Sequence, residues 1–254
     1  MYEEYYAPLP DAAAYLERIG LGGEKIPLNR AGLDRLICAH LTHVPFENLV
    51  ECFDHGCPDL RVPALFDKIV TRRRGGYCFE LNGAFYALLK ALGFTVYPVA
   101  CRVRWLHSER SPLSHRGTIA VIDGEKFYCD VGFGGPSPHC AVPFSTEAEG
   151  GFFITVEGEE TQVRRHTPEG DEMIISFEDN AFDPIDFIPL NFHIAMAPGS
   201  YFAMAPMLNL VTEEGSIALN GDTLRIHNGG EATEVKVAPE EQAAVMDKYF
   251  GIRL

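Results

Sequence analysis

Residues 74–82 read RGGYCFELN, a stretch in which two glycines precede a cysteine and an amphipathic run begins directly behind it. The residues that can pair with Cys78 must decide its role, because free cysteines also occur as buried filler and as metal ligands. A helix that begins here would place its positive dipole end near the sulfur, which favours the reactive thiolate. We expect Gly75 and Gly76 to let the backbone turn tightly just before it.

The flanking residues predict a helical N-terminal part. Apolar residues at helical spacing place one helix between Cys78 and Gly93. Upstream, apolar spacing, an Asp11 N-cap and a proline signal predict three more helices: over 11–20, over 30–41 and from Pro63.

After Gly93 the sequence changes to strand patterns. Residues 94–105 are rich in β-branched and aromatic side chains, and Asp123-Gly124 is a strong hairpin signal. The predicted strands are 94–105, 118–122, 126–131, 152–156, 161–165, 173–177, 223–227 and 233–237. Pro239 is expected to open a last helix, whereas the apolar, proline-punctuated segment 180–210 gives no clear prediction. The order of elements indicates an α+β fold.

Composition excludes several classes of protein. The chain has 254 residues, of which 46% are hydrophobic and 22% charged, which is typical of globular proteins. No apolar run approaches the roughly 18 residues that span a bilayer. The net charge of −15 disfavours nucleic acids and anionic membranes as partners. A phosphate-bearing ligand would therefore need local backbone or side-chain donors.

The cysteines favour a reducing compartment. There are seven of them, an odd number without a CxxC pair, and the N-terminal residues do not read as a secretory signal. We therefore expect free thiols and a cytoplasmic protein. Cys52 and Cys57, with His55 between them, resemble half of a zinc site, but a second pair of ligands at short spacing is not visible, so we expect no metal.

Two residues of the predicted hairpin could complete a catalytic site with Cys78. His115 lies just before the strand 118–122, and Asp130 ends the second strand. Across a hairpin these two can come close, so that Asp130 could hold the ring of His115. Nucleophile, base and orienting carboxylate would then form a cysteine-protease-like Cys-His-Asp core. Alone, Cys78 could equally be buried filler, and a single histidine such as His115 is more often structural or solvent-exposed.

Four motifs together resemble the arylamine N-acetyltransferases: RGGYCFELN (74–82), PFENL (45–49), His115 and DVGFG (130–134). The order and spacing of Cys78, His115 and Asp130 match the triad of that family. Further similar segments extend the resemblance over nearly the whole chain: AYLERIGL (14–21), DFIPLN (186–191) and PGSYF (198–202).

The resemblance implies a fold in three parts. These are an N-terminal helical bundle carrying the nucleophile (1–93), a central β-barrel carrying the histidine and aspartate (94–200), and a C-terminal α/β lid (201–254). It also implies a ping-pong reaction, in which acetyl-CoA acetylates Cys78. An aromatic amine, hydrazine or N-hydroxyarylamine then takes the acetyl group.

Substrate contacts also follow from the resemblance. It implies that three phenylalanines line the acceptor pocket: Phe46, Phe133 and Phe202. It implies that three small residues contact CoA: Ser114, Gly134 and Gly135. The arginine before the two glycines is structural in the family, so Arg74 is expected to be an internal donor and Glu47 its partner.

Two segments depart from the family pattern and leave the substrate open. FHIAMA (192–197) and WLHSERSPLS (105–114) border the expected acceptor and CoA regions. The alternatives are an amide synthase or acyltransferase with another acyl donor, a papain- or transglutaminase-like cysteine hydrolase, and a catalytically inactive binding protein. The sequence makes no prediction of the oligomeric state.

Overall fold

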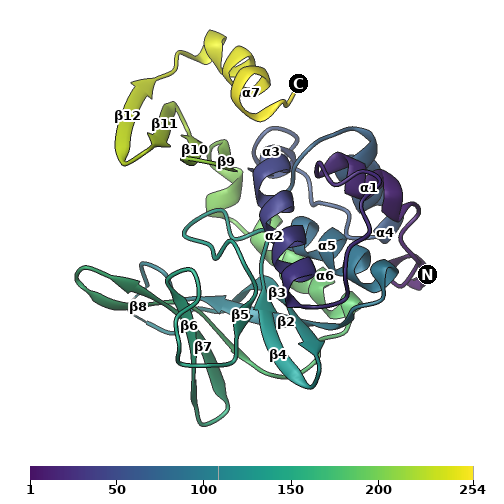
Figure 1. Ribbon diagram of the computed structural model, residues 1–254. Coiled ribbons are helices and arrows are strands. Elements are labelled where there is room, and N and C mark those ends of the chain that lie inside the picture. Colours follow the sequence, from purple (N-terminus) through teal and green to yellow (C-terminus); the bar gives the residue numbers. More distant parts are fainter. Residues whose placement is uncertain (108, 254) are drawn as a thin grey trace.

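The computed structural model describes residues 1–107 and 109–253 and combines helices with two antiparallel sheets. The helices are α1 (Ala12–Arg18), α2 (Arg30–His43), α3 (Leu49–Cys52), α4 (Val62–Phe66), α5 (Cys78–Leu92), α6 (Phe187–Met196) and α7 (Gln242–Phe250). Short helical turns are η1 (Glu3–Tyr5), η2 (Asp67–Thr71), η3 (Pro184–Asp186), η4 (Tyr201–Ala203) and η5 (Pro239–Glu241). Figure 1 shows α1, α2, α4 and α5 gathered on one side of the molecule.

Local capping explains where the N-terminal helices begin and end. The Asp11 side chain accepts a hydrogen bond from the backbone N–H of Ala14 at 3.0 Å, which confirms it as the N-cap of α1. Gly93 ends α5 in the left-handed conformation, with φ of 100°, which glycine adopts without steric cost. The helices predicted over 11–20, over 30–41 and around Pro63 are confirmed as α1, α2 and α4.

The larger sheet has seven strands in the order β5-β4-β3-β2-β8-β7-β6. Their bounds are β2 (Thr95–Val103), β3 (Leu113–Ile122), β4 (Glu125–Cys129), β5 (Val142–Pro143), β6 (Phe152–Glu157), β7 (Glu160–Thr167) and β8 (Gly170–Glu178). The two edges meet, because the N–H of Ile154 in β6 donates to the carbonyl of Ser145, just after β5, at 2.9 Å. The expected barrel is thus confirmed as a nearly closed one.

The smaller sheet forms the C-terminal part of the molecule. Its strand order is β1-β9-β10-β11-β12, and the strands are β1 (Phe46–Glu47), β9 (Met207–Thr212), β10 (Gly215–Asn220), β11 (Thr223–Asn228) and β12 (Glu231–Lys236). Together with α7 it forms the expected α/β lid (Figure 1). The two-residue strand β1 lies in the PFENL motif of the helical part and pairs with β9. This strand pairing connects the lid to the helical part.

Three clusters of buried apolar residues form the core. One fills the helical part, a second the barrel and a third the space between the C-terminal sheet and α7. Leu49 and Cys52 of α3 belong to the third cluster, and Phe187 of α6 belongs to the first. Within the described residues, helices long and apolar enough to cross a membrane do not occur.

Candidate active site

Cys78 is the first residue of α5, as the sequence predicts. Its side chain is only 4% exposed, and its sulfur lies 3.9 Å from the carbonyl oxygen of Ser114 in β3. The carboxylate of Glu80 accepts the backbone N–H of Tyr77 at 3.1 Å and fixes the first turn of the helix. Cys78 therefore sits at the positive end of the α5 dipole and faces the barrel.

Gly75 and Gly76 are required for a different reason from the one expected. Neither has a positive φ, so neither makes the tight turn; Arg73, with φ of 53°, adopts the left-handed conformation instead. A Cβ at Gly75 would lie 2.0 Å from the carbonyl oxygen of Pro45, and one at Gly76 would lie 2.8 Å from Glu80 Oε2. The glycines thus permit close approach to neighbouring segments.

His115 and Asp130 come together as predicted. His115 lies within β3, and Asp130 directly follows the last residue of β4. The distance from His115 Nε2 to Asp130 Oδ2 is 2.6 Å, and the side chains are 2% and 1% exposed. The ring is thus held from the Nε2 side.

The Asp130 carboxylate accepts four hydrogen bonds. Oδ2 accepts from His115 and from the Tyr128 hydroxyl at 2.8 Å, while Oδ1 accepts from Asn82 Nδ2 at 2.8 Å and the Gly132 N–H at 2.9 Å. Burial would raise the pKa of Asp130, but the charge of His115 and these donors lower it below its ordinary value. The carboxyl group is therefore ionised at neutral pH.

Electrostatics favours a protonated His115. Burial alone would lower the pKa of His115, but the charge and hydrogen bond of Asp130, with the nearby Cys78 sulfur, raise it to about 10. At neutral pH the ring is an imidazolium between a carboxylate and a sulfur. Such an arrangement can stabilise a thiolate and supply a proton to a leaving group.

Asn82 is a site residue that the sequence interpretation missed. It lies four residues after Cys78 and hence on the same face of α5. Besides Asp130, its side chain binds the carbonyl oxygen of Arg116 at 2.6 Å and the N–H of Val131 at 2.9 Å. A signal was present in RGGYCFELN, because an amide one turn after the cysteine would need partners on a buried face.

The three phenylalanines of the predicted acceptor pocket lie around the same region. The rings of Phe46 and Phe202 are 6.4 Å apart, and the ring of Phe133 packs edge-on against His115 at 5.5 Å. Phe46 is buried, whereas Phe133 and Phe202 are half-buried. Phe133, in the segment after β4, thus borders the histidine, while Phe46 of β1 and Phe202 of η4 border each other.

The small residues expected to contact CoA have mixed surroundings. Gly134 has φ of 71°, and a Cβ there would meet the Phe46 ring at 2.9 Å. At Gly135, a Cβ would meet Trp105 at 3.0 Å. Packing against protein rings therefore already requires these glycines, and contact with CoA stays a prediction. Ser114 is half-exposed beside His115.

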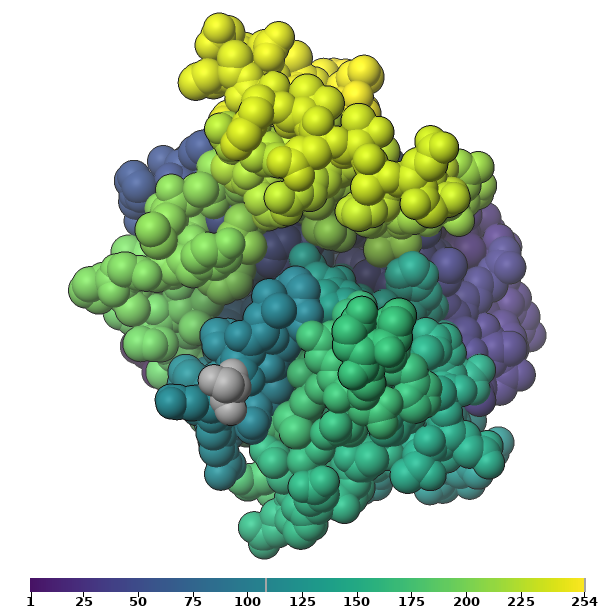
Figure 2. All heavy atoms as spheres, turned by 90° about the vertical axis from the view of Figure 1, so that its left-hand side faces the viewer, coloured from purple at the N-terminus to yellow at the C-terminus, as the bar shows by residue number. Residues whose placement is uncertain are grey.

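The surface is hollowed next to these elements. Figure 2 shows a depression between the C-terminal sheet and helix (yellow) and the barrel (teal to green), beside the light-green segment that contains α6 and η4. In the two segments that depart from the family pattern, Trp105 packs against Phe133 at 6.1 Å, and Phe192 in the middle of α6 is 59% exposed.

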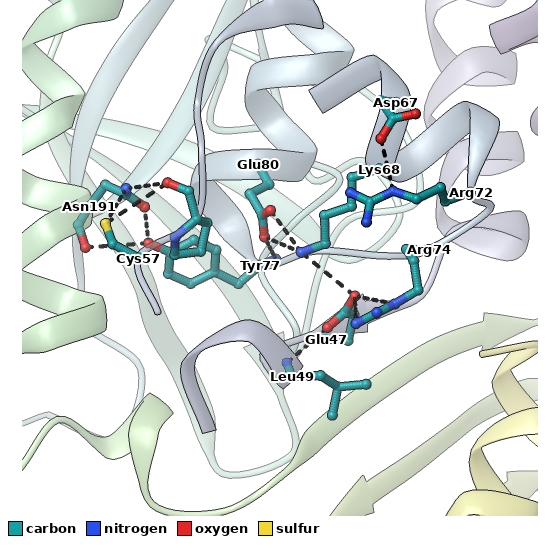
Figure 3. Close-up of polar contacts among 11 residues, drawn as sticks. Glu47, Leu49, Cys57, Asp67, Lys68, Arg72, Arg74, Tyr77, Glu80 and Asn191 are labelled. Carbon is teal, nitrogen blue, oxygen red and sulfur yellow. Dashed lines mark hydrogen bonds and ion pairs between the residues drawn. The ribbon is translucent and has the colours of Figure 1, made fainter. Parts of the chain in front are cut away.

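A buried ionic cluster includes Glu80 of the first turn of α5 (Figure 3). Arg74 donates to Glu47 Oε1 from Nε at 3.1 Å and from Nη2 at 2.9 Å, which confirms Arg74 as an internal donor. Lys68 Nζ lies 2.7 Å from Glu80 Oε1. Glu51 is fully buried nearby, and its carboxylate oxygens have no hydrogen-bond partner among the described residues.

The cysteines are free thiols, as expected. Cys57 does not pair with Cys52; its sulfur receives the side-chain N–H of Asn191 at 3.0 Å. In the part of the chain that the structure describes, groups of three or more His, Cys, Asp or Glu arranged to hold a metal ion are not found.

The chain is similar to one family of enzymes along almost its entire length. Residues 31–254 match the family model described as N-acetyltransferase. The arylamine N-acetyltransferase of Mycolicibacterium smegmatis is 30% identical, over 96% of this chain and 92% of that protein. The arylamine N-acetyltransferase of Mycobacterium tuberculosis is 29% identical, over 96% and 90%. The solved arylamine N-acetyltransferase from Salmonella typhimurium superimposes with a TM-score of 0.90 at 25% identity, over 97% and 92%.

Proposed function

The chain belongs to the arylamine N-acetyltransferase family, and we propose that it moves acetyl groups from acetyl-CoA to aromatic amines, hydrazines or N-hydroxyarylamines through a thioester on Cys78. One observation carries this proposal: Cys78 at the start of α5 faces a His115 ring that Asp130 holds at 2.6 Å. The three residues come from a helix, a strand and the residue after a strand.

In the first half-reaction, the Cys78 thiolate attacks the carbonyl carbon of acetyl-CoA. The new bond joins the sulfur of Cys78 to the acetyl carbon, and the bond from that carbon to the CoA sulfur breaks. His115, protonated at neutral pH, gives its proton to the departing CoA thiolate. Asp130 is the charge that keeps the ring protonated and oriented before the attack.

In the second half-reaction, the neutral His115 that remains acts as a base. The nitrogen of the amine attacks the acetyl carbon, His115 takes the proton that the nitrogen loses, and the bond to the Cys78 sulfur breaks. The thiolate–imidazolium pair is then restored. A thioester is still activated toward nitrogen, so storing the acetyl group on sulfur divides one transfer into two easier steps.

Substrate contacts complete the proposal. Phe46, Phe133 and Phe202 would bind the aromatic ring of the acceptor. The contact of Phe133 with His115 and the contact between Phe46 and Phe202 support this assignment. Ser114, Gly134 and Gly135 would face CoA. The developing oxyanion needs donors, and the backbone N–H of Cys78 at the N-terminus of α5 is a candidate.

The test is intact-mass spectrometry and peptide mapping after mixing with acetyl-CoA in the absence of acceptor. We expect one acetyl group, on Cys78, which an added arylamine removes as its N-acetyl product. An acetyl group on Cys52, Cys57 or Cys129 would contradict the mechanism. Reaction only with longer acyl donors would favour an amide synthase, and rapid release of acetate without acceptor would favour a hydrolase.

A further inference from the structure

The side chain of Asn191 connects three segments that are far apart in sequence (Figure 3). It lies in α6 and is 3% exposed. Its Nδ2 donates to the carbonyl oxygen of Pro58 at 2.9 Å, and its Oδ1 accepts from the hydroxyl of Tyr77, the residue before Cys78. A buried amide with partners at both ends fixes the position of the backbone that carries it.

The ring of Tyr77 extends this connection to the predicted acceptor pocket. Tyr77 is fully buried, and its ring packs edge-on against Phe202, with 5.7 Å between the centroids. Burial and the nearby Cys78, Glu51 and Glu80 raise the pKa of Tyr77 well above its usual value, so that its hydroxyl remains a donor to Asn191. The ring of Tyr77 therefore contacts Phe202 while its hydroxyl is fixed by Asn191 of α6.

Phe202 itself packs against the buried cluster of the helical part and has further contacts of its own. Its carbonyl oxygen accepts from Asn48 Nδ2 at 2.7 Å, and its ring meets Phe46 at 6.4 Å. The side chains near it in sequence, Tyr201 and Met204, are exposed. The Tyr201 ring nevertheless lies 6.3 Å from the Phe202 ring, so three rings surround Phe202. The ring of Tyr77 is the nearest of the three and is fully buried, so the orientation of the Phe202 ring depends most on Tyr77.

We propose that Asn191 and Tyr77 are positioning residues for the acceptor half-reaction, because together they set the place of Phe202 against the aromatic ring of the amine. This inference rests on the proposed function, in which Phe202 contacts the acceptor. It assigns Asn191 no contact with acetyl-CoA. Loss of the pair should therefore impair acceptance of the acetyl group by an aromatic amine and leave acetylation of Cys78 nearly unchanged.

The test measures the two half-reactions separately in the full chain. Tyr77→Phe removes the hydroxyl and keeps the ring, and Asn191→Leu removes the amide at similar volume. Acetylation of Cys78 is followed by quenched-flow mass spectrometry without acceptor. Transfer from the acetyl-enzyme is then measured with aniline, which has a ring for Phe202, and with hydrazine, which has none.

We expect both variants to acetylate within about twofold of the parent and to need about tenfold more aniline for half-maximal transfer. This lies below the roughly 100-fold that a 1 Å misplacement of reacting groups can cost. Transfer to hydrazine should stay within about twofold. Because the two residues act through one hydrogen bond, the double variant should be no worse than the poorer single variant.

Three results would overturn the inference: equal slowing of both half-reactions, equal slowing with aniline and hydrazine, or parent-like transfer to aniline by Tyr77→Phe. The Tyr77→Phe variant keeps the inference testable if Asn191→Leu does not fold. A parent that takes no acetyl group on Cys78 would instead contradict the proposed function, so the two failures are distinguishable.

Discussion

Asn82 Nδ2 lies 2.8 Å from Asp130 Oδ1, although Asn82 belongs to α5 and Asp130 follows β4 in the barrel. The helix that presents Cys78 therefore also holds the carboxylate that holds His115. Because Asn82 lies four residues after Cys78, one helix face fixes both ends of the proposed triad. A shift of α5 would move nucleophile and carboxylate together.

We predict that Asn82→Ala lowers both activity and stability. The variant removes one donor from Asp130 and leaves the carbonyl of Arg116 and the N–H of Val131 without their partner. A buried group that loses its partner costs about 1–3 kcal/mol, so unfolding in urea should show a loss of this order or more. We expect kcat/KM to fall by about 10- to 100-fold, which corresponds to a similar energy. Unchanged activity of the fully folded variant would show that His115, Tyr128 and the N–H of Gly132 suffice to hold Asp130.

Asp130→Asn should abolish most of the activity. The amide fills the same space but lacks the charge that raises the pKa of His115. The comparable change in serine triads costs roughly 10⁴-fold in kcat, and a loss of that order is expected here. Asp123→Asn at the tip of the same hairpin is the matched control, because asparagine tolerates its φ of 53°. Comparable activity of the two variants would reduce Asp130 to a structural residue.

The parts of the fold that the sequence predicts are those with local signals. Caps mark α1 and α5, and Asp123-Gly124 marks the hairpin of β3 and β4. The two residues of β1 show no alternation that could predict a strand; they become one only because β9 pairs with them. Helix α6 was not predicted, because apolar residues lie on all sides of it and so show no one-sided helical pattern. Pro189 within the helix also argued against it.

The site residues likewise fall into those that the sequence predicts and those that it does not. Residue types and their order predict Cys78, His115 and Asp130, because the chemistry itself constrains them. Asn82 and Asn191 were missed because their partners lie 48 and 114 residues away, beyond any local pattern. The glycines before Cys78 were placed correctly but for the wrong reason, since a steric contact with Pro45 has no sequence signature.

Arg74→Met should destabilise the fold far more than the same change at its neighbour Arg72. Arg74 pairs with the fully buried Glu47, so its removal leaves a buried carboxylate without this partner. Breaking such pairs costs about 3–5 kcal/mol. Arg72 pairs with Asp67 on the exposed surface, where the expected cost is about 0–1 kcal/mol. Equal urea midpoints for the two variants would contradict a structural role of Arg74.

The pairing of Cys78 with His115 can be followed by alkylation. We expect iodoacetamide at neutral pH to modify Cys78 faster than any other cysteine of the protein, because an adjacent imidazolium favours the reactive thiolate. The pKa of His115, raised to about 10, keeps the imidazolium present at this pH. His115→Ala should abolish this selectivity. Peptide mapping of the alkylation rates would refute the ion pair if Cys78 reacts equally fast in parent and variant.

Glu51 is fully buried, and its carboxylate has no hydrogen-bond partner among the described residues. Burial and the charge of Glu80 raise the pKa of Glu51 to about 8, although Lys68 opposes them. In the unfolded chain the pKa is about 4.3. Between these values the folded state binds one proton more than the unfolded state, so the free energy of unfolding falls as pH rises. The slope is about 1.4 kcal/mol per pH unit. The stabilisation is present in full below the unfolded value and is lost once pH has risen through about 8.

Glu51→Gln removes this titration and should flatten the decline in stability between about pH 6 and pH 8. Part of the slope should remain, because burial also raises the pKa of Glu80. Urea unfolding at both pH values measures the difference, and Glu159→Gln in the exposed turn between β6 and β7 is the control that should follow the parent. Parallel declines for parent, Glu51→Gln and control would mean that the folded protein ionises Glu51 at neutral pH. In that case Lys68 would have to compensate Glu51 as well as Glu80 in the buried ionic cluster.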